Sequence, residues 1–392
     1  MLRTCRVRLL ALKPKGLVLP SIHASLVRAF RRIGVLVEEI PASIALGAAS
    51  PLVSFWPKRS GVEAVLALDM GAEPGLIPKV RELQLEMAVP WIFWFLDHPE
   101  GYGFPESCHP DWSLVLCWDK ALAQGLSSKG PLPVRHLPLA SDPALFHPRG
   151  SQGEVSDLQG VFVGSTRHPN PFLEDAANRC PGLLEAAQKL WNYHREHMDL
   201  PMEDTAWRQA AALENPPFSG IREDPLWRLW VKSCLHLAGR IKRVEMVEEI
   251  LGARGAVFGD PSWKGLLKKV PYLGPIRYGA RLKDVYLRSC FVLEVRQPQS
   301  HGGLSQRVFD ASLCARPVLA EWSPELEEVL GGPERVWAFR SLEEAVKARK
   351  LCLGFPSEAL KRAYSARKEI LSRHTFLHRA RFLVEHLKKE FF

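Results

Sequence analysis

Residues 300–321 restrict the fold more than any other part of this chain. They follow an apolar strand at 291–295 and read as a glycine-containing loop, an amphipathic helix, a short turn and a second apolar strand. A strand, a helix and a second strand in this order form a βαβ unit, whose two strands lie parallel in one sheet. Ligands of such sheets bind at the carboxyl ends of the strands. The segment therefore predicts a parallel sheet and the edge at which it binds a ligand.

The loop and the helix of this segment carry residues that suit an anionic ligand. Gly302 and Gly303 come directly before the helix that contains Leu304, Arg307 and Asp310. Backbone amides at a helix N-terminus suit a diphosphate, and a guanidinium offers it paired hydrogen bonds. The Asp310 carboxylate suits two adjacent ribose hydroxyls. We interpret the segment as a nucleotide-sugar site; the alternatives are a plain glycine turn, a solvated aspartate and an ion pair between Arg307 and Asp310.

Apolar strands alternate with helical segments along most of the chain. This alternation predicts an α/β fold with doubly wound parallel sheets. At 392 residues the chain is too long for one typical core, so we expect two domains. The expected strands lie at 3–12, 35–40, 64–70, 89–97, 113–119 and 134–140 in the first half, and at 160–164, 256–260, 291–295, 317–321 and 335–339 in the second.

A stretch rich in Pro, Gly, Ser and Asp begins at residue 141 and marks the linker between the two domains. We place the first domain at 1–150 and the second at 156–365. The second domain contains a helical insertion at about 171–251, which is longer than one crossover helix. The chain ends in a long helix at roughly 357–389, and we assign residues 366–392 to a separate C-terminal helical segment.

Composition excludes several classes of protein. The net charge of +9 is scattered, and short basic runs such as Arg240, Lys242 and Arg243 read as solvated helix faces, so we expect no nucleic-acid groove. Eight cysteines without a CxxC pair indicate reduced thiols in a cytoplasmic protein. No apolar run approaches the roughly 20 residues that span a bilayer. His194 is expected to be exposed, and no cysteine–histidine spacing matches a standard zinc site.

The second half resembles the C-terminal domain of GT-B glycosyltransferases, and more narrowly the CgeB-like, spore-maturation-type group. The resemblance is specific over 258–345, and 94–99 is similar to the N-terminal domain of the same group. It is carried by a Tyr-Gly pair before a helix, a Tyr on that helix, an Arg-x-Phe-Asp-Ala helix, a Pro-Val-Leu turn and a trailing Glu: Tyr278, Gly279, Tyr286, Arg307, Phe309, Asp310, Ala311, Pro317, Val318, Leu319 and Glu325.

This resemblance implies two facing Rossmann-like domains. The nucleotide sugar lies mainly on the C-terminal domain, where Tyr278 and Glu325 are further donor contacts, and a final helix crosses back to the N-terminal, acceptor-binding domain. Such folds usually use no metal ion or other cofactor. Many retaining members carry a Glu-x7-Glu pair, and here Gly302 occupies its first position, so a retaining outcome is not supported. Ala315–Arg316 also replaces the usual glycine before the Pro-Val turn.

Two further loops are candidates for contact with substrate. Gly164, Ser165 and Arg167 follow the first strand of the second domain, where amides, a hydroxyl and a guanidinium suit donor phosphates; an ordinary polar loop is the alternative. Asp97 and His98 follow a buried strand of the first domain. If the reaction inverts the anomeric centre, one of them is expected to act as the general base for the acceptor hydroxyl. The alternative for Asp97 is a bond to neighbouring backbone amides.

The sequence therefore leads to one main hypothesis and two rivals. We expect a soluble, cytoplasmic, metal-independent glycosyltransferase that uses a nucleoside-diphosphate sugar. Its acceptor is a glycan, a protein or a lipid-linked intermediate. One rival is a non-catalytic nucleotide-sugar-binding or scaffold protein in glycan assembly. The other is an epimerase of related fold, which changes the sugar nucleotide without an acceptor.

Overall fold

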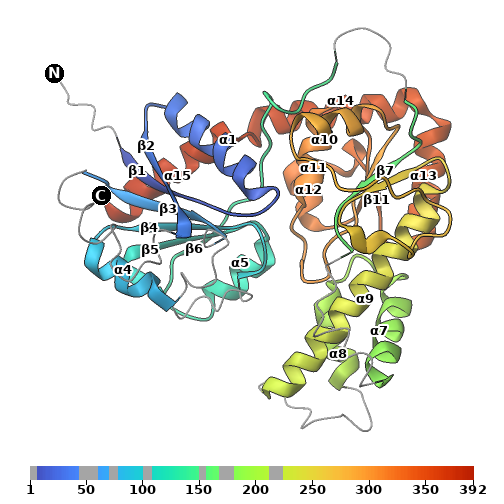
Figure 1. Ribbon diagram of the computed structural model, residues 1–392, viewed down its shortest axis with the longest axis horizontal. Helices are drawn as coiled ribbons and strands as arrows, with labels where there is room; N and C mark the ends of the chain where they lie inside the picture. The colour runs from blue at the N-terminus through green and yellow to red at the C-terminus, as the bar shows by residue number, and fades with distance from the viewer. Residues whose placement is uncertain are drawn as a thin grey trace. The chain divides into compact units, whose positions relative to one another are not determined.

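The computed structural model describes residues 7–43, 61–69, 78–99, 108–149, 156–166, 181–211 and 224–392. The chain divides into two compact units (Figure 1). Unit 1 comprises residues 1–142 and 371–392, and unit 2 comprises residues 143–370. The chain therefore leaves the first unit, forms the second, and returns to the first near its end.

Unit 1 is built on a parallel sheet with the strand order β2-β1-β3-β4-β5-β6. Strands β3, β4 and β5 are buried at every residue, as expected for a parallel sheet covered on both faces. The strands are β1 (Arg8–Lys13), β2 (Leu36–Pro41), β3 (Ala64–Leu68), β4 (Trp91–Phe95), β5 (Ser113–Cys117) and β6 (Val134–His136); the helices are α1 (Leu19–Arg32), α4 (Val80–Met87), α5 (Lys120–Ser127) and α15 (Phe376–Phe391).

Unit 2 is built on a second parallel sheet with the order β11-β10-β9-β7-β8. Helices connect its strands in the same manner. The strands are β7 (Val161–Val163), β8 (Ala256–Phe258), β9 (Val292–Leu293), β10 (Val318–Glu321) and β11 (Trp337–Phe339); the helices outside the insertion are α10 (Ala280–Leu287), α11 (Gln306–Leu313), α12 (Pro324–Leu330), α13 (Leu342–Gly354) and α14 (Pro356–Arg373).

The two sheets share one topology. In each, the first strand lies between the second and the third, which is the 2-1-3-4-5 order of doubly wound folds. The strand order therefore reverses between β1 and β3 in unit 1 and between β7 and β9 in unit 2. Ligands of such sheets bind at this switch point, outside the carboxyl ends of the strands. The predicted fold class of two doubly wound parallel sheets is confirmed.

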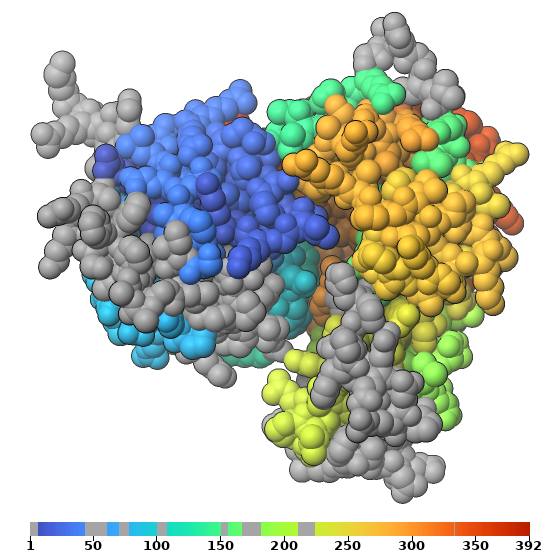
Figure 2. Space-filling model, in the orientation of Figure 1, coloured from blue at the N-terminus to red at the C-terminus, as the bar shows by residue number. Residues whose placement is uncertain are grey.

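Three helices of unit 2 form a bundle of their own, in the region where the sequence predicts an insertion. They are α7 (Pro181–His194), α8 (Met202–Ala211) and α9 (Pro225–Leu251). The bundle extends from the sheet of unit 2, and its yellow-green surface is seen below the orange part of that unit in Figure 2. Buried side chains such as Trp191 and Trp227 belong to a core that continues into the sheet through Phe162 and Leu319. The bundle is therefore packed on the sheet of unit 2.

Three polar side chains of this bundle correct the sequence analysis. His194 and Lys242 are 1% exposed and Arg243 is 3% exposed, so the prediction of solvated positions is wrong for all three. The partners of Lys242 and Arg243 lie on a strand and a loop outside the bundle, His194 lies beside Lys242, and all are described below. Local sequence gives no sign of such partners, which is why these residues were assigned to the surface.

The end of the chain differs from the single long helix predicted at 357–389. Helix α14 ends at Arg373 and α15 begins at Phe376. Thr375 caps α15. Its backbone N–H donates to His378 Nδ1 at 3.3 Å, and its hydroxyl forms a hydrogen bond with the same nitrogen at 2.8 Å. In unit 1 the chain near the break pairs with residue 141, because the Ser141 N–H donates to the His374 carbonyl. Among the described residues no helix is long and apolar enough to cross a membrane.

Candidate functional site

Arg307 lies at the switch point of unit 2. Its Nη1 donates to the Val163 carbonyl at 2.7 Å, at the end of β7, and its Nη2 donates to the Val295 carbonyl at 3.4 Å, just beyond β9. The guanidinium also lies 5.0 Å from the centre of the Phe162 ring and 3.9 Å from Glu294 Oε1. Arg307 thus joins the two strands between which the order reverses, and it brings a positive charge to the edge where ligands bind.

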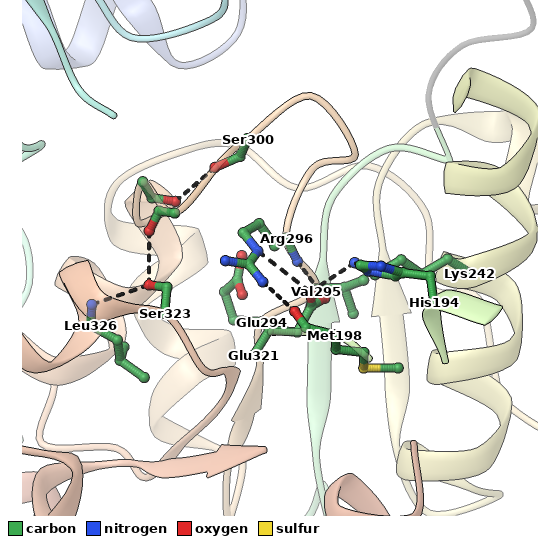
Figure 3. A network of polar contacts seen from close by, with 12 residues as sticks. His194, Met198, Lys242, Glu294, Val295, Arg296, Ser300, Glu321, Ser323 and Leu326 are labelled. Carbon is green, nitrogen blue, oxygen red and sulfur yellow. Dashed lines mark hydrogen bonds and ion pairs between the residues drawn. The ribbon is translucent and has the colours of Figure 1, made fainter. Parts of the chain in front are cut away.

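A network of buried charges lies at the carboxyl ends of β9 and β10 (Figure 3). Lys242 Nζ donates to Glu321 Oε2 at 2.7 Å, and the backbone N–H of Arg296 donates to Glu321 Oε1 at 2.9 Å. The Arg296 side chain lies 3.5 Å from Glu321 and donates to the Met198 carbonyl of the insertion. The network therefore ties the helical insertion to the strand ends.

The protonation of this network follows from its burial. Burial lowers the pKa of Lys242, although the Glu321 carboxylate opposes that shift. Burial also raises the pKa of Glu294, against the pull of Arg307. Burial and the charges of Lys242 and Arg296 hold the pKa of His194 well below its usual range, so its ring is neutral. Since Lys242 Nζ is a donor and lies 3.3 Å from His194 Nε2, the ring proton is on Nδ1.

The Gly302–Gly303 loop lies beside this network, and buried hydroxyls hold it (Figure 3). Ser323 Oγ donates to the Gly302 carbonyl at 2.8 Å, and Ser300 Oγ donates to the Gly303 carbonyl at 3.2 Å. A Cβ added to Gly302 would lie 3.7 Å from Glu325 Oε1, so the predicted donor contact Glu325 is next to the glycine pair. Leu304, 7% exposed, continues the loop to the N-terminus of α11.

Asp310 lies inside unit 2 rather than on its surface. It is 0% exposed, and its two oxygens accept hydrogen bonds from the Tyr278 hydroxyl and from Gln306 Nε2, both at 2.8 Å. Phe146 packs edge-on against Tyr278 with ring centres 5.3 Å apart. Burial and the Asp310 charge raise the pKa of Tyr278 well above its usual value, which keeps the phenol a donor. The structure joins Tyr278 with Asp310, and a ribose would reach Asp310 only after these side chains move.

The loop after β7 is held from several sides. The Gly164 N–H donates to the Phe258 carbonyl at 2.9 Å, and the Gly164 carbonyl accepts from Trp263 Nε1 at 2.8 Å. Arg243 donates to the Ser165 carbonyl, which explains its burial. A Cβ on Gly164 would lie 2.9 Å from Arg307 Nη1, so the glycine allows the guanidinium to approach. Gly164 and Ser165 therefore lie at the switch point, whereas Arg167 is outside the described residues.

The predicted catalytic pair lies in unit 1, directly after β4. Asp97 and His98 are both half-buried, and Asp97 Oδ1 accepts the His98 N–H at 2.8 Å. A second acid, Asp69, supports them. Asp69 follows β3, is 3% exposed, and its Oδ1 accepts the N–H of Leu96 at 2.7 Å and of Asp97 at 3.2 Å. Burial raises the pKa of Asp69 to about 7, against these two hydrogen bonds.

Sequence reasoning missed Asp69, Glu294, Arg296 and Ser323. Asp69 and Glu294 each follow or end a buried apolar run, which is the same signal that selected Asp97. Ser323 stands before Pro324, which is a helix-start signal. In the described part of the chain no cluster of three or more His, Cys, Asp or Glu side chains is arranged to hold a metal ion.

Comparison with known proteins found a family similar to the C-terminal part of the chain. Residues 240–385 match the family described as glycosyl transferase-like. This range contains the glycine loop, α11 and the strand ends β9 and β10. No curated protein is detectably similar to the whole chain in sequence.

Solved structures show the architecture of the whole chain. HepE of Anabaena in complex with UDP and glucose is 14% identical, with a TM-score of 0.55 over 98% of this chain and 100% of that one. Sucrose-phosphate synthase of Thermosynechococcus elongatus is 12% identical, with a TM-score of 0.53 over 98% and 99% of the two chains. A glycosyltransferase of Rickettsia africae is 11% identical, with a TM-score of 0.53 over 98% and 99%. The chain has the GT-B architecture, and its residues 240–385 are similar to the glycosyl transferase-like family.

Proposed function

We propose that this protein is a glycosyltransferase that moves a sugar from a nucleoside-diphosphate sugar to an acceptor. One observation carries the proposal. The region that matches the glycosyl transferase-like family carries a glycine loop held by Ser323 just after β10, the N-terminus of α11, and Arg307 at the switch point of unit 2. The same two-sheet architecture occurs in a protein solved with UDP-glucose, which is 15% identical. We propose that the chain belongs with the CgeB-like group of such enzymes.

The proposed donor site uses the carboxyl edge of the unit 2 sheet. The diphosphate binds at the glycine loop and the N-terminus of α11, where amides and a helix dipole favour an anion. Arg307, and Arg167 in the loop after β7, supply positive charge, so we propose that the transfer requires no metal ion. Glu325 and Tyr278 remain proposed donor contacts. For Asp310 we propose contact with the ribose after its bond to Gln306 opens.

The proposed chemistry places the general base in unit 1. Asp97 or His98 removes the proton of the acceptor hydroxyl as that oxygen attacks the anomeric carbon. The nucleoside diphosphate leaves with the bonding electrons of the broken C–O bond. Gly302 stands where many retaining GT-B enzymes carry a glutamate, so we do not propose retention. Hexosyl transfer, a cytoplasmic location and an acceptor that is a glycan, protein or lipid-linked intermediate complete the proposal.

A thermal-shift screen followed by a turnover assay tests this function. The first step measures the melting temperature with UDP, GDP, CDP or dTDP, and then with the common sugar derivatives of each nucleotide. A ligand at a hundredfold excess over its dissociation constant adds about 2.7 kcal/mol of stability. The second step measures release of nucleoside diphosphate from the stabilising sugar nucleotide in extracts of candidate acceptors, with and without EDTA. We expect release that EDTA does not reduce.

Two variants separate an enzyme from a binding protein. Asp97→Asn and His98→Ala should keep the thermal shift of the wild type, and at least one should lose nucleotide release by about 100-fold or more, the usual contribution of a general base. Stabilisation without release in the wild type would instead support the scaffold alternative, which the absence of a glutamate at position 302 keeps open. No shift with any nucleotide would refute both.

A further inference from the structure

Two buried serines fix the orientation of the glycine loop in unit 2 (Figure 3). Ser323 is 1% exposed and Ser300 is 4% exposed. Their hydroxyls donate to two successive carbonyls, Ser323 to Gly302 at 2.8 Å and Ser300 to Gly303 at 3.2 Å. Hydrogen bonds in such a dry environment are stronger than in water, and they hold both peptide groups of the loop.

The direction of the loop amides follows from these two bonds. In a trans peptide the C=O of one residue and the N–H of the next point in opposite directions. The N–H groups of Gly303 and Leu304 are therefore directed away from the serine hydroxyls. Glycine adopts many backbone conformations at similar cost, so without the serines the loop would populate several orientations. The hydroxyls thus select one arrangement of two adjacent amides before α11.

Ser323 has a second role that any test must separate from the first. It is the N-cap of α12, and its Oγ accepts the Leu326 N–H at 3.2 Å. The same hydroxyl therefore accepts a hydrogen bond from the helix and donates one to the glycine loop. Glycine is nearly as good an N-cap as serine, at a cost of only a few tenths of a kcal/mol. A glycine at 323 removes the bond to Gly302 and leaves the helix end almost unaffected.

We propose that Ser323 is a positioning residue for the diphosphate of the donor, with Ser300 as its partner. Neither serine contacts the ligand. They orient the Gly302–Gly303 and Gly303–Leu304 peptides, so that the loop does not lose conformational freedom when the diphosphate binds. This inference rests on the proposed function, since it assumes that the loop receives a nucleoside diphosphate.

The test measures the dissociation constant of the full-length protein for whichever of UDP, GDP, CDP and dTDP stabilises the wild type most. Ser323→Gly should weaken binding about five- to tenfold, which corresponds to about 1 to 1.4 kcal/mol. Ser323→Thr keeps both hydrogen bonds and should restore affinity to within about twofold of wild type. Ser300→Ala removes the other hydroxyl and should weaken binding similarly, which gives a second reading if the threonine is poorly accommodated at 323.

A matched control is available on α13. Ser341 caps that helix by accepting the Glu344 N–H at 3.1 Å, away from the glycine loop. Ser341→Gly should leave the nucleotide affinity at the wild-type value. Equal losses in Ser323→Gly and Ser341→Gly, or no loss in Ser323→Gly and Ser300→Ala, would overturn the positioning role while leaving the proposed function intact. A wild type that binds none of the four nucleotides would overturn both.

Discussion

The ion pair between Lys242 and Glu321 gives the most specific stability prediction. The two side chains are 2% and 0% exposed, and their closest atoms are 2.7 Å apart. Removal of one partner of a buried pair costs about 3–5 kcal/mol, because the other charge is left uncompensated. In Lys242→Met the Glu321 carboxylate keeps the Arg296 N–H at 2.9 Å and the Arg296 side chain at 3.5 Å. We therefore expect Lys242→Met to lower the free energy of unfolding by about 3 kcal/mol, the lower end of that range.

The same substitution on the surface of the insertion provides the control. Lys189 pairs with Glu185 at 2.8 Å along α7, but the two side chains are 72% and 68% exposed. Lys189→Met should cost no more than about 0.5 kcal/mol. For a unit of about 230 residues, 3 kcal/mol lowers the melting temperature by roughly 6–12 °C. Differential scanning calorimetry of both variants measures the difference and resolves the two units if they unfold separately.

A double-mutant cycle makes this prediction refutable. If the two charges interact, Lys242→Met and Glu321→Gln together should cost less than the sum of the single substitutions, by about 1 kcal/mol or more. A melting temperature of Lys242→Met equal to that of Lys189→Met would contradict the reasoning. So would strict additivity in the cycle, because either result means that no buried charge is left unpaired.

Three further predictions concern other parts of the chain. Since the pKa of Asp69 rises from 3.8 to about 7 on folding, its contribution to stability is full below about pH 4 and is lost as pH rises through 7. Asp69→Asn, which keeps the acceptor oxygen, should therefore gain melting temperature relative to wild type between pH 5 and pH 8, and a constant difference would contradict this. Arg379 is 5% exposed and donates to the Pro138 and Leu139 carbonyls at 2.7 Å. Arg379→Met should therefore lower the free energy of unfolding, measured by urea denaturation, by about 3 kcal/mol. A loss below about 1 kcal/mol would argue against these hydrogen bonds. A Cβ on Gly259 would lie 2.0 Å from the Gly164 carbonyl oxygen, whereas a Cβ on Gly302 would make ordinary contacts. Gly259→Ala should therefore have a much lower melting temperature than Gly302→Ala. Equal melting temperatures would contradict the close approach at Gly259.

Periodicity and the residues around the glycine loop were enough to predict the fold class. Buried strands of a parallel sheet are continuous apolar runs, and the runs at β4 and β5 have this pattern at every residue. Strands β4 and β9 are shorter than predicted, because apolar residues beyond the last paired residue do not join the ladder. At the chain end, helical periodicity continues across residues 374 and 375. The break there depends on hydrogen bonds to residue 141, which local sequence does not indicate.

Buried polar residues were harder to predict than the apolar core. Lys242 and its partner Glu321 are 79 positions apart, and nothing near either residue indicates the other. Asp310 was expected to bind a ribose, with a solvated position as the alternative; its burial against Tyr278 and Gln306 was not predicted, and Tyr278 is 32 positions away. Ser323 was recognisable as a helix cap from Pro324, whereas its bond to Gly302 requires the loop to fold against the end of β10. A single sequence predicts local structure and leaves such long-range pairs undetermined.

Hydrogen–deuterium exchange with and without the stabilising nucleotide sugar tests the central claim most directly. The claim is that the donor binds at the carboxyl edge of the unit 2 sheet. We predict slower exchange on binding in peptides that cover 296–306, the glycine loop and the start of α11, and in peptides that cover 164–166. Exchange in α7 of the insertion, for example 184–193, should stay unchanged. Slower exchange confined to unit 1, or no change at 296–306 under saturating ligand, would contradict the claim.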